Sequence, residues 1–270
     1  MTPHDGEYFG SADQQALLRR GRAMFDLIGD DARFGYYGRT VGLASSDSGS
    51  IDMLAALAKL QGNSNCAILP DADLPRWRAA AEARGLVPVH YARWSGADAA
   101  MQAAREIVGS HALPDDLTIV RIGPEAPDAH LSQLAALSLA CGVLPPAGSA
   151  LRGLDKPGLA LLALDGSGRG VSCAAAASYL HDRHPLARQC WWGMLATIPE
   201  RRGQRLALVL GAMAMLDASE RLGFTEVFTG VEPGNAASEA VCERLGLTRE
   251  TSSVLGVADP SLLPGGRMTK

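Results

Sequence analysis

Short apolar runs alternate with longer amphipathic stretches along this chain, and that alternation is typical of an α/β protein. In the first part of the chain the pattern predicts helices at residues 14–27, 51–60, 74–84 and 98–108. Strands are expected between them at residues 40–44, 66–69 and 87–92. Residues 109–116 hold a proline and two aspartates and are the best candidate for a linker. We therefore expect an N-terminal domain of residues 1–114 and a C-terminal domain of residues 115–270.

The second part of the chain shows the same alternation. It predicts a strand at 117–122, a helix at 129–141, a hairpin of 159–165 with 170–179, and a strand at 191–198. A long helix then begins at Leu206 and ends at Gly223, a residue suited to the left-handed position after a helix. A strand at 226–231, a helix at 236–245 and a strand at 252–257 follow.

An internal repeat links the two parts. Residues 51–88 align with residues 212–249 without a gap at an offset of 161, which is the difference 246 − 85 between Gly246 and Gly85. Gly62 then falls on Gly223, and helix, strand and helix follow in the same order in both segments. Glycines at helix ends can coincide by chance, but the matching order of elements favours two related domains in tandem.

The loop between the strand at 191–198 and the helix from Leu206 is basic and contains a glycine (PERRGQR, residues 199–205). A helix N-terminus leaves backbone amides unpaired and carries the positive end of the helix dipole. With Arg201 and Arg202 beside those amides, the loop is predicted to bind a diphosphate. The alternative for the two arginines is ordinary surface charge.

The composition of the chain limits the kinds of partner that we expect it to bind. The chain has 270 residues, 47% of them hydrophobic, and a net charge of −4, so it can build a large core and offers no general footprint for nucleic acid. Its five cysteines show no metal-ligand spacing and no disulfide framework, so no metal is expected and the location is predicted to be cytoplasmic. The N-terminus lacks a signal-peptide pattern, and the apolar run at 206–216 is too short to span a membrane.

Two motifs of the second part, roughly residues 117–258, resemble those of the GCN5-related N-acetyltransferases (the GNAT superfamily). Residues 202–207 (RGQRLA) are similar to the family's Gln/Arg-x-x-Gly-x-Gly/Ala loop, except that Arg205 replaces the central glycine. Residues 235–247 (NAASEAVCERLGL) are similar to its Asn-x-x-Ala-x-x-x-Tyr-x-x-Leu-Gly-Phe ending, except that Ser238, Cys242 and Leu247 replace the alanine, tyrosine and phenylalanine. A predicted strand separates the motifs, as it does in the family.

The resemblance implies an acyl-CoA N-acyltransferase fold, in which helices flank a mixed central sheet, here with two related domains in tandem. It further implies direct transfer of an acetyl group from acetyl-CoA to a primary amine of a small molecule or peptide, without a metal. Asn235 would contact the cofactor near its pantetheine arm, and the backbone of Leu195, Ala196 and Thr197 would pair with that arm. The residues expected at the pyrophosphate are Arg202, Gly203, Gln204, Arg205, Leu206 and Ala207.

The acid and base of such a reaction are less clearly marked. Cys242 could protonate the leaving thiolate, but a small core residue is the alternative, and a bound water could replace it. Glu232, three residues before Asn235, is a candidate base or a solvated loop acid. An imidazole can accept a proton from an ammonium group, which makes His181 a further candidate base, but it and His184 could equally belong to a polar surface loop.

The first part of the chain lacks the basic loop, because residues 41–46 stand at the equivalent position and contain no arginine. We therefore expect one acetyl-CoA site, in the C-terminal domain. A non-catalytic acyl-CoA-binding sensor or scaffold is the first alternative, and an unrelated nucleotide-binding protein the second. No nucleic acid or membrane partner is expected, and a homodimer is left open.

Overall fold

The computed structural model describes residues 7–265 and 268. Residues 1–6 therefore lie outside the described residues, and with them most of the N-terminal segment in which the sequence predicts no signal peptide. Within the described part, the strands form one ten-stranded sheet in the order β1-β2-β3-β10-β4-β9-β8-β7-β6-β5. The pairs β2–β3 and β8–β9 are parallel and the other neighbours are antiparallel, so the sheet is mixed as expected.

The elements alternate along the chain as the hydrophobic pattern predicts. The strands are β1 (Phe34–Gly35), β2 (Gly42–Leu43), β3 (Asn63–Pro70), β4 (Val87–Gly96), β5 (Thr118–Ile122), β6 (Gly158–Leu164), β7 (Gly170–Ser178), β8 (Gln189–Thr197), β9 (Glu226–Val231) and β10 (Thr248–Ala258). The α-helices are α1 (Ala12–Ile28), α2 (Ile51–Gln61), α3 (Leu74–Glu82), α4 (Asp98–Ser110), α5 (Asp128–Ala140), α6 (Gly148–Leu151), α7 (Leu206–Leu222) and α8 (Ala236–Arg244). A 3-10 turn, η1 (Pro199–Arg201), precedes α7.

The clearest differences from the sequence prediction lie in β3, β4 and β10, which are each several residues longer than expected. They are long because β10 pairs with β3 on one side and with β4 on the other along most of their length, a contact between distant parts of the chain that local patterning does not reveal. Two short elements, β1 and α6, were not predicted.

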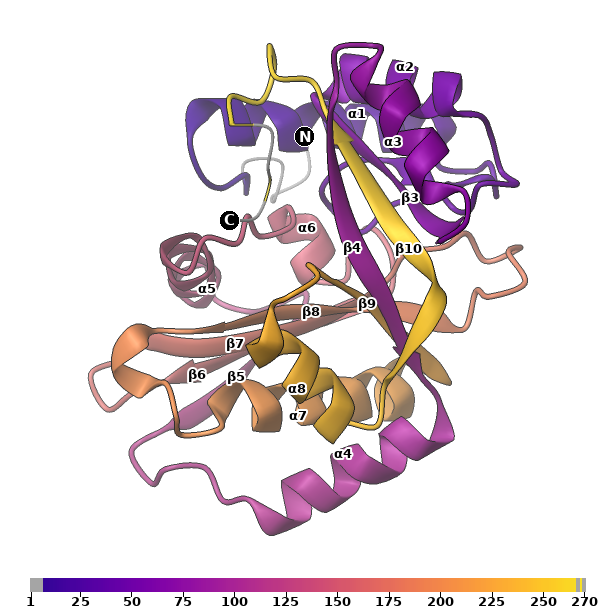
Figure 1. The fold of residues 1–270 in the computed structure, drawn as a ribbon. Helices are drawn as coiled ribbons and strands as arrows, with labels where there is room; N and C mark the ends of the chain where they lie inside the picture. Colours follow the sequence, from indigo (N-terminus) through magenta and orange to yellow (C-terminus); the bar gives the residue numbers. More distant parts are fainter. Residues whose placement is uncertain (1–6, 266–267, 269–270) are drawn as a thin grey trace.

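The repeat seen in the sequence also organises the centre of the sheet. Ser253 of β10 pairs with Ala92 of β4, and 253 − 92 is again 161, so equivalent residues of the two segments face each other. Outside this pair, β3 flanks β10 and β9 flanks β4, which is a symmetric arrangement. The C-terminal strand β10 therefore lies between two strands of residues 1–114, and β4 lies between two strands of residues 115–270 (Figure 1).

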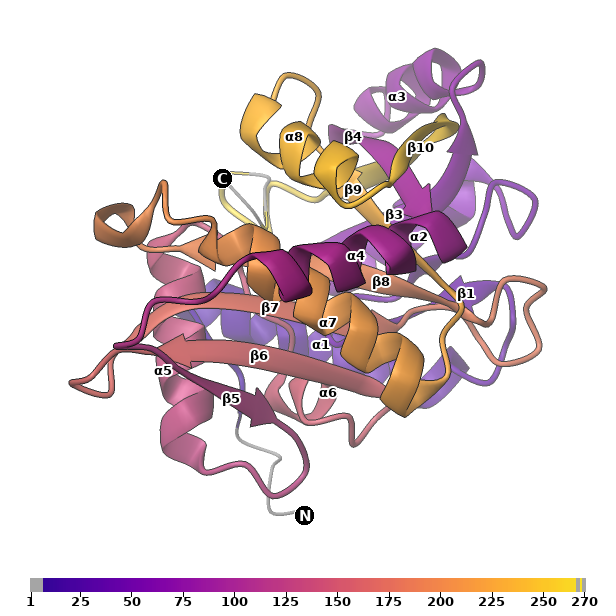
Figure 2. The same ribbon diagram turned by 90° about the horizontal axis from the view of Figure 1, so that it is seen from below.

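Helices cover both faces of the second part of the sheet. Figure 1 shows α5 and α6 on one side of β6–β8 and α7, α8 and α4 on the other. Figure 2 shows α4, which comes from the first part of the chain, running beside α7. Every residue of β7 is buried, and its run of small residues lets helices approach the strand closely from both sides.

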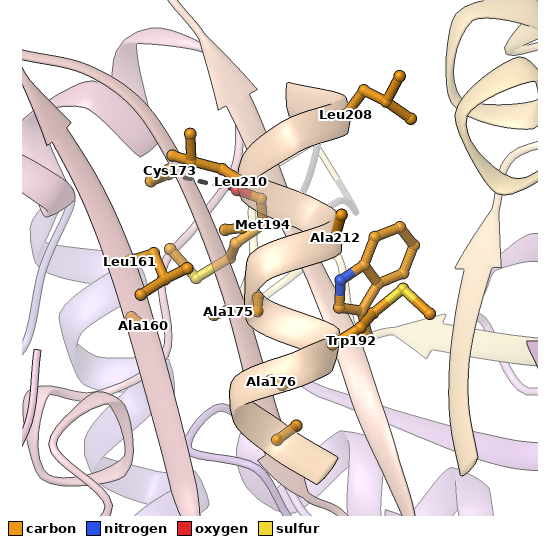
Figure 3. Close-up of a cluster of buried hydrophobic side chains, with 14 of the residues drawn as sticks. Ala160, Leu161, Cys173, Ala175, Ala176, Trp192, Met194, Leu208, Leu210 and Ala212 are labelled. Atoms are coloured by element: carbon orange, nitrogen blue, oxygen red, sulfur yellow. Dashed lines mark hydrogen bonds between the residues drawn. The ribbon is translucent and has the colours of Figure 1, made fainter. Parts of the chain in front are cut away.

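The main core fills the space between α7 and strands β6 to β8. In Figure 3, Leu210 and Ala212 of α7 lie over Ala175, Trp192 and Met194 of the sheet. The indole Nε1 of buried Trp192 donates to the carbonyl of Gly211, 3.0 Å away, which satisfies the polar atom inside the core. This packing fixes α7, and thus the start of α7, relative to β8.

Candidate functional site

Strands β8 and β9 diverge at the centre of the sheet. They pair in parallel only where residues Gln189–Trp191 meet Glu226–Phe228, although both strands continue beyond that point. A cavity of about 350 Å³ opens there, lined on one side by Gly193, Met194 and Leu195 and on the other by residues 228–232. The separation leaves the backbone of β8 accessible to a ligand that would take the place of a neighbouring strand.

A β-bulge bends β8 beside this cavity. Cys173 of β7 pairs with Ala196 and Ala175 pairs with Gly193, so Met194 and Leu195 together stand opposite the single residue Ala174. Met194 has a φ of 56°, in the left-handed region that non-glycine residues rarely adopt. The bulge turns backbone groups of β8 out of the ladder at the edge of the cavity. The sequence gives no signal for it, because Met194 is not a residue typical of that conformation.

The predicted diphosphate loop follows β8 directly and leads into α7. The last residue before the helix is Arg205, and in the described residues no side chain caps the N-terminus of α7. The first amides of α7 are therefore available to an anion. Gly203 and Arg205 both have positive φ values, 78° and 60°. Arg205 thus adopts a glycine-like conformation at the position where the similar loop of the GNAT superfamily has glycine.

The arginines of this loop have different surroundings. Arg201 forms two hydrogen bonds with the carboxylate of Asp116, at 2.9 and 3.0 Å, so its charge is already matched. Arg202 is exposed and its Nε donates to the carbonyl of Thr197 at 3.4 Å. The guanidinium of Arg205 lies 2.6 Å from Nε2 of His111, which comes from the end of α4. Two of the three side chains thus remain oriented around the start of α7 without a carboxylate partner among the described residues.

The predicted residues of the second motif lie at the other wall of the cavity. Asn235 lines it and also caps α8, because its Oδ1 accepts a hydrogen bond from the amide of Ser238 at 3.2 Å. Glu232 lines the cavity at the end of β9. Cys242 lines it as well but is only 2% exposed, and burial raises the pKa of its thiol to about 12.

The cavity lining does not include the predicted loop residues 202–207, and three further predicted residues also lie away from it. Ala196 and Thr197 continue β8 toward the loop, where the carbonyl of Ala196 and the hydroxyl of Thr197 contact the hydroxyl of Ser172 of β7. Nε2 of His181 lies 3.3 Å from Oδ1 of Asp30, and the cavity lining does not include His181. The structure thus brings Glu232, Asn235 and Cys242 together with Leu195, and places His181 elsewhere.

The far wall of the cavity comes from the first part of the chain, which the sequence suggested as one possible wall of an acceptor site without indicating the residues. Residues 34–43 run along the second part: the amide of Tyr36 donates to the carbonyl of Tyr179, and Ala147 donates to Gly38, at 2.9 and 2.7 Å. This placement brings Tyr37 and Arg39 to the cavity. The aromatic rings around them are those of Tyr179, Trp191 and Phe228.

Comparison with known proteins identifies the fold. No family model and no curated protein matches the sequence. Among solved structures, a GCN5-related N-acetyltransferase from Kribbella flavida superimposes with a TM-score of 0.53 at 14% identity, over 90% of this chain and 95% of its own. A putative acetyltransferase of the GNAT family from Novosphingobium aromaticivorans gives 0.53 at 18% identity, over 82% of this chain and 83% of its own.

A tandem GNAT protein from the clavulanic acid biosynthesis pathway also matches, with a TM-score of 0.50 at 14% identity, over 77% of this chain and 67% of its own. Identities this low establish the fold alone. The chain therefore has the fold of the GCN5-related N-acetyltransferases, and the fold predicted from its two motifs is confirmed. In the described part of the chain, no helix is long and apolar enough to cross a membrane.

Proposed function

We propose that this protein is an N-acyltransferase that moves an acetyl group from acetyl-CoA to a primary amine. One observation carries the proposal: the open backbone of β8 is followed, after the loop of residues 198–205, by the uncapped start of α7. A thioester cofactor with a pantetheine arm and a diphosphate needs these two features in this order. The arm would pair along Leu195, Ala196 and Thr197, and the diphosphate would accept hydrogen bonds from the amides of residues 203–207.

The chemistry of transfer fits the same cleft. A neutral amine attacks the thioester carbonyl, and negative charge develops on its oxygen. A backbone amide of the bulge at Met194 would donate to that oxygen, and the position of the bulge on β8 at the edge of the cavity supports this role. Glu232, directly or through a water molecule, would accept the proton of the incoming ammonium group.

The leaving thiolate needs a proton, and the structure weighs against Cys242 as its source. A thiol whose pKa is raised to about 12 stays protonated at neutral pH but gives up its proton poorly. An ordinary thiol has a pKa of about 8.5, so transfer from Cys242 to the thiolate of CoA would run uphill. We therefore propose that the thiolate receives, through a bound water, the proton that the nitrogen loses as the amide forms, and that Cys242 packs beneath the cofactor.

Acetyl-CoA binding tests the proposal most directly. In isothermal titration we expect micromolar affinity for the wild type and a loss of about tenfold or more for Arg202→Glu, since the new carboxylate repels the diphosphate at an exposed site. Arg76→Glu makes the same charge change on α3, away from the loop, and should bind like the wild type. Failure of the folded wild type to bind acetyl-CoA would remove the basis of the proposal.

Turnover then separates the enzyme from a sensor. Release of free CoA would be followed with a panel of primary amines and saturating acetyl-CoA. Transfer to any amine establishes an acyltransferase. Tight binding of acetyl-CoA without transfer to any amine in the panel would instead favour the non-catalytic acyl-CoA-binding role, which the substitutions Arg205 and Cys242 in the two motifs also suit.

A further inference from the structure

The side chain of Arg39 is a buried cation without a counter-ion. The residue is only 6% exposed, and its Nε and Nη2 atoms have no hydrogen-bond partner. Its one hydrogen bond runs from Nη1 to the hydroxyl of Tyr37, at 3.0 Å, and none of the ion pairs formed by the described residues includes it. A buried charge left in this state is strongly unfavourable unless a ligand completes it.

The guanidinium is nevertheless held in a defined orientation. Its Cζ atom lies 5.3 Å from the centroid of the Tyr37 ring and 5.5 Å from that of Trp191. These two rings contact each other with their centroids 4.5 Å apart. The hydrogen bond to Tyr37 uses Nη1, so the opposite edge of the guanidinium, formed by Nε and Nη2, is buried and has no partner among the described residues. A pair of parallel N–H groups on one edge matches the two oxygens of a carboxylate.

Arg39 and the proposed cofactor cleft share one cavity, which also contains Leu195, Asn235 and Glu232. Among the described residues that line it, Arg39 is the only basic side chain and Glu232 the only acidic one. A single positive charge suits a monoanion better than a phosphate dianion. A second buried atom, Oδ1 of Asn63, also lines this cavity without a donor, so it can accept a hydrogen bond from the same ligand.

We propose that Arg39 binds a carboxylate of the acetyl acceptor, so the acceptor is a small amine that carries one carboxylate, such as a free amino acid. This inference rests on the proposed function. A cavity of about 350 Å³ lies near the lower end of ligand pockets, which favours a small acceptor over a protein side chain. The carboxylate would contact Arg39, and the amine would point toward β8 and Glu232.

Matched pairs of substrates test the inference. Each proteinogenic amino acid would be compared with its carboxamide, which keeps the amine and side chain but removes the charge. For the best acceptor we expect kcat/KM to favour the acid by about 100-fold, since the site is built to pair with the missing group. In Arg39→Met that ratio should collapse toward one, and Arg39→Lys should lie between, because it keeps the charge but loses the fork.

Arg33→Met is the matched control. Arg33 lies in the same part of the chain but is exposed and paired with Asp31, so its loss should leave the ratio unchanged. If Arg39→Met does not fold, binding of acids and amides to the wild type with CoA present, measured by thermal shift, decides the question. Acids should raise the melting temperature and amides should not.

The two proposals fail in different ways. A wild type that binds acetyl-CoA but prefers amides, or binds none of the amino acids, overturns the role of Arg39 and leaves the acetyltransferase proposal standing. A wild type that does not bind acetyl-CoA would contradict the proposed function. Thermal shift with the amino acids alone still tests Arg39 in that case, and an equal response of the wild type and Arg39→Met would overturn the inference.

Discussion

Arg205 has the backbone conformation of a glycine but keeps a long side chain. Its φ of 60° lies in the left-handed region, where a side chain with a Cβ costs about 1–2 kcal/mol. The guanidinium contacts His111 and the N-terminal end of α7, so charge at the proposed diphosphate site accompanies this strain. Backbone strain of this kind is commonly found at ligand-binding loops.

We therefore expect Arg205→Gly to leave stability unchanged or raise it by up to about 1 kcal/mol, because relief of the left-handed strain offsets the entropy of glycine. Arg202→Gly removes the same side chain at a position with a φ of −67° and should lower stability by a few tenths of a kcal/mol to about 1 kcal/mol. Urea unfolding of both variants measures the difference. A larger loss of stability for Arg205→Gly than for Arg202→Gly would contradict this account.

At the scale of single residues, roles that depend only on neighbouring residues in the chain could be predicted from the sequence. Asn235 follows a Pro-Gly turn and precedes a helix, so its capping role could be predicted, and its place at the cavity follows from the motif. Arg39 could not be found in this way. It lies in a short irregular segment, and its importance comes from missing partners that only the packed structure reveals. The position of His181 away from the cavity agrees with the alternative of a polar loop that the sequence left open.

Helix α1 packs so closely on the segment of Arg39 that a glycine is required between them. A Cβ added to Gly21 would lie 1.9 Å from the carbonyl oxygen of Arg39 and 3.0 Å from the Cα of Thr40. Both are backbone atoms, so they cannot rotate away as a side chain could. The close approach of α1 therefore helps to position the proposed carboxylate anchor.

Gly21→Ala should lower the free energy of unfolding by about 1–3 kcal/mol, because the overpacking outweighs the higher helix propensity of alanine. Gly109→Ala provides the control: it also lies in a helix, but a Cβ there meets nothing within 4 Å, so we expect a gain of about 0.5–1 kcal/mol. Chemical denaturation of both variants tests the contrast. Equal effects would mean that α1 can shift without cost.

Among the elements, the helices and strands β5 to β9 were the most predictable, since each has a clear period and good end signals. Gly62 and Gly223 end α2 and α7 in the left-handed conformation, as their positions after apolar periodic runs suggested. The lengths of β4 and β10 were not predictable, because their outer residues are ordered by pairing with a strand more than a hundred residues away. The divergence of β8 from β9 likewise depends on what each strand meets on its other side.

At the scale of the whole molecule, the sheet does not divide at the predicted linker. Strand β4 of the first part lies between β9 and β10, and β10 lies between β3 and β4. Helix α4 of the first part also covers α7 of the second, as Figure 2 shows. Residues 1–114 and 115–270 therefore complete each other's sheet and core, and the cavity draws its walls from both.

We accordingly expect residues 115–270 expressed alone to be insoluble or molten, because removal of β4 exposes the edges of β9 and β10 and removal of α4 uncovers α7. Co-expression of residues 1–114 and 115–270 as separate chains should restore a soluble complex, since the cut falls in the loop between α4 and β5, outside both elements. The readouts are solubility, near-ultraviolet circular dichroism and acetyl-CoA binding by titration. The full chain serves as the control. A soluble 115–270 fragment with cooperative unfolding and full affinity for acetyl-CoA would show that the second part folds independently, and that the exchange of strands serves only the acceptor side of the cavity.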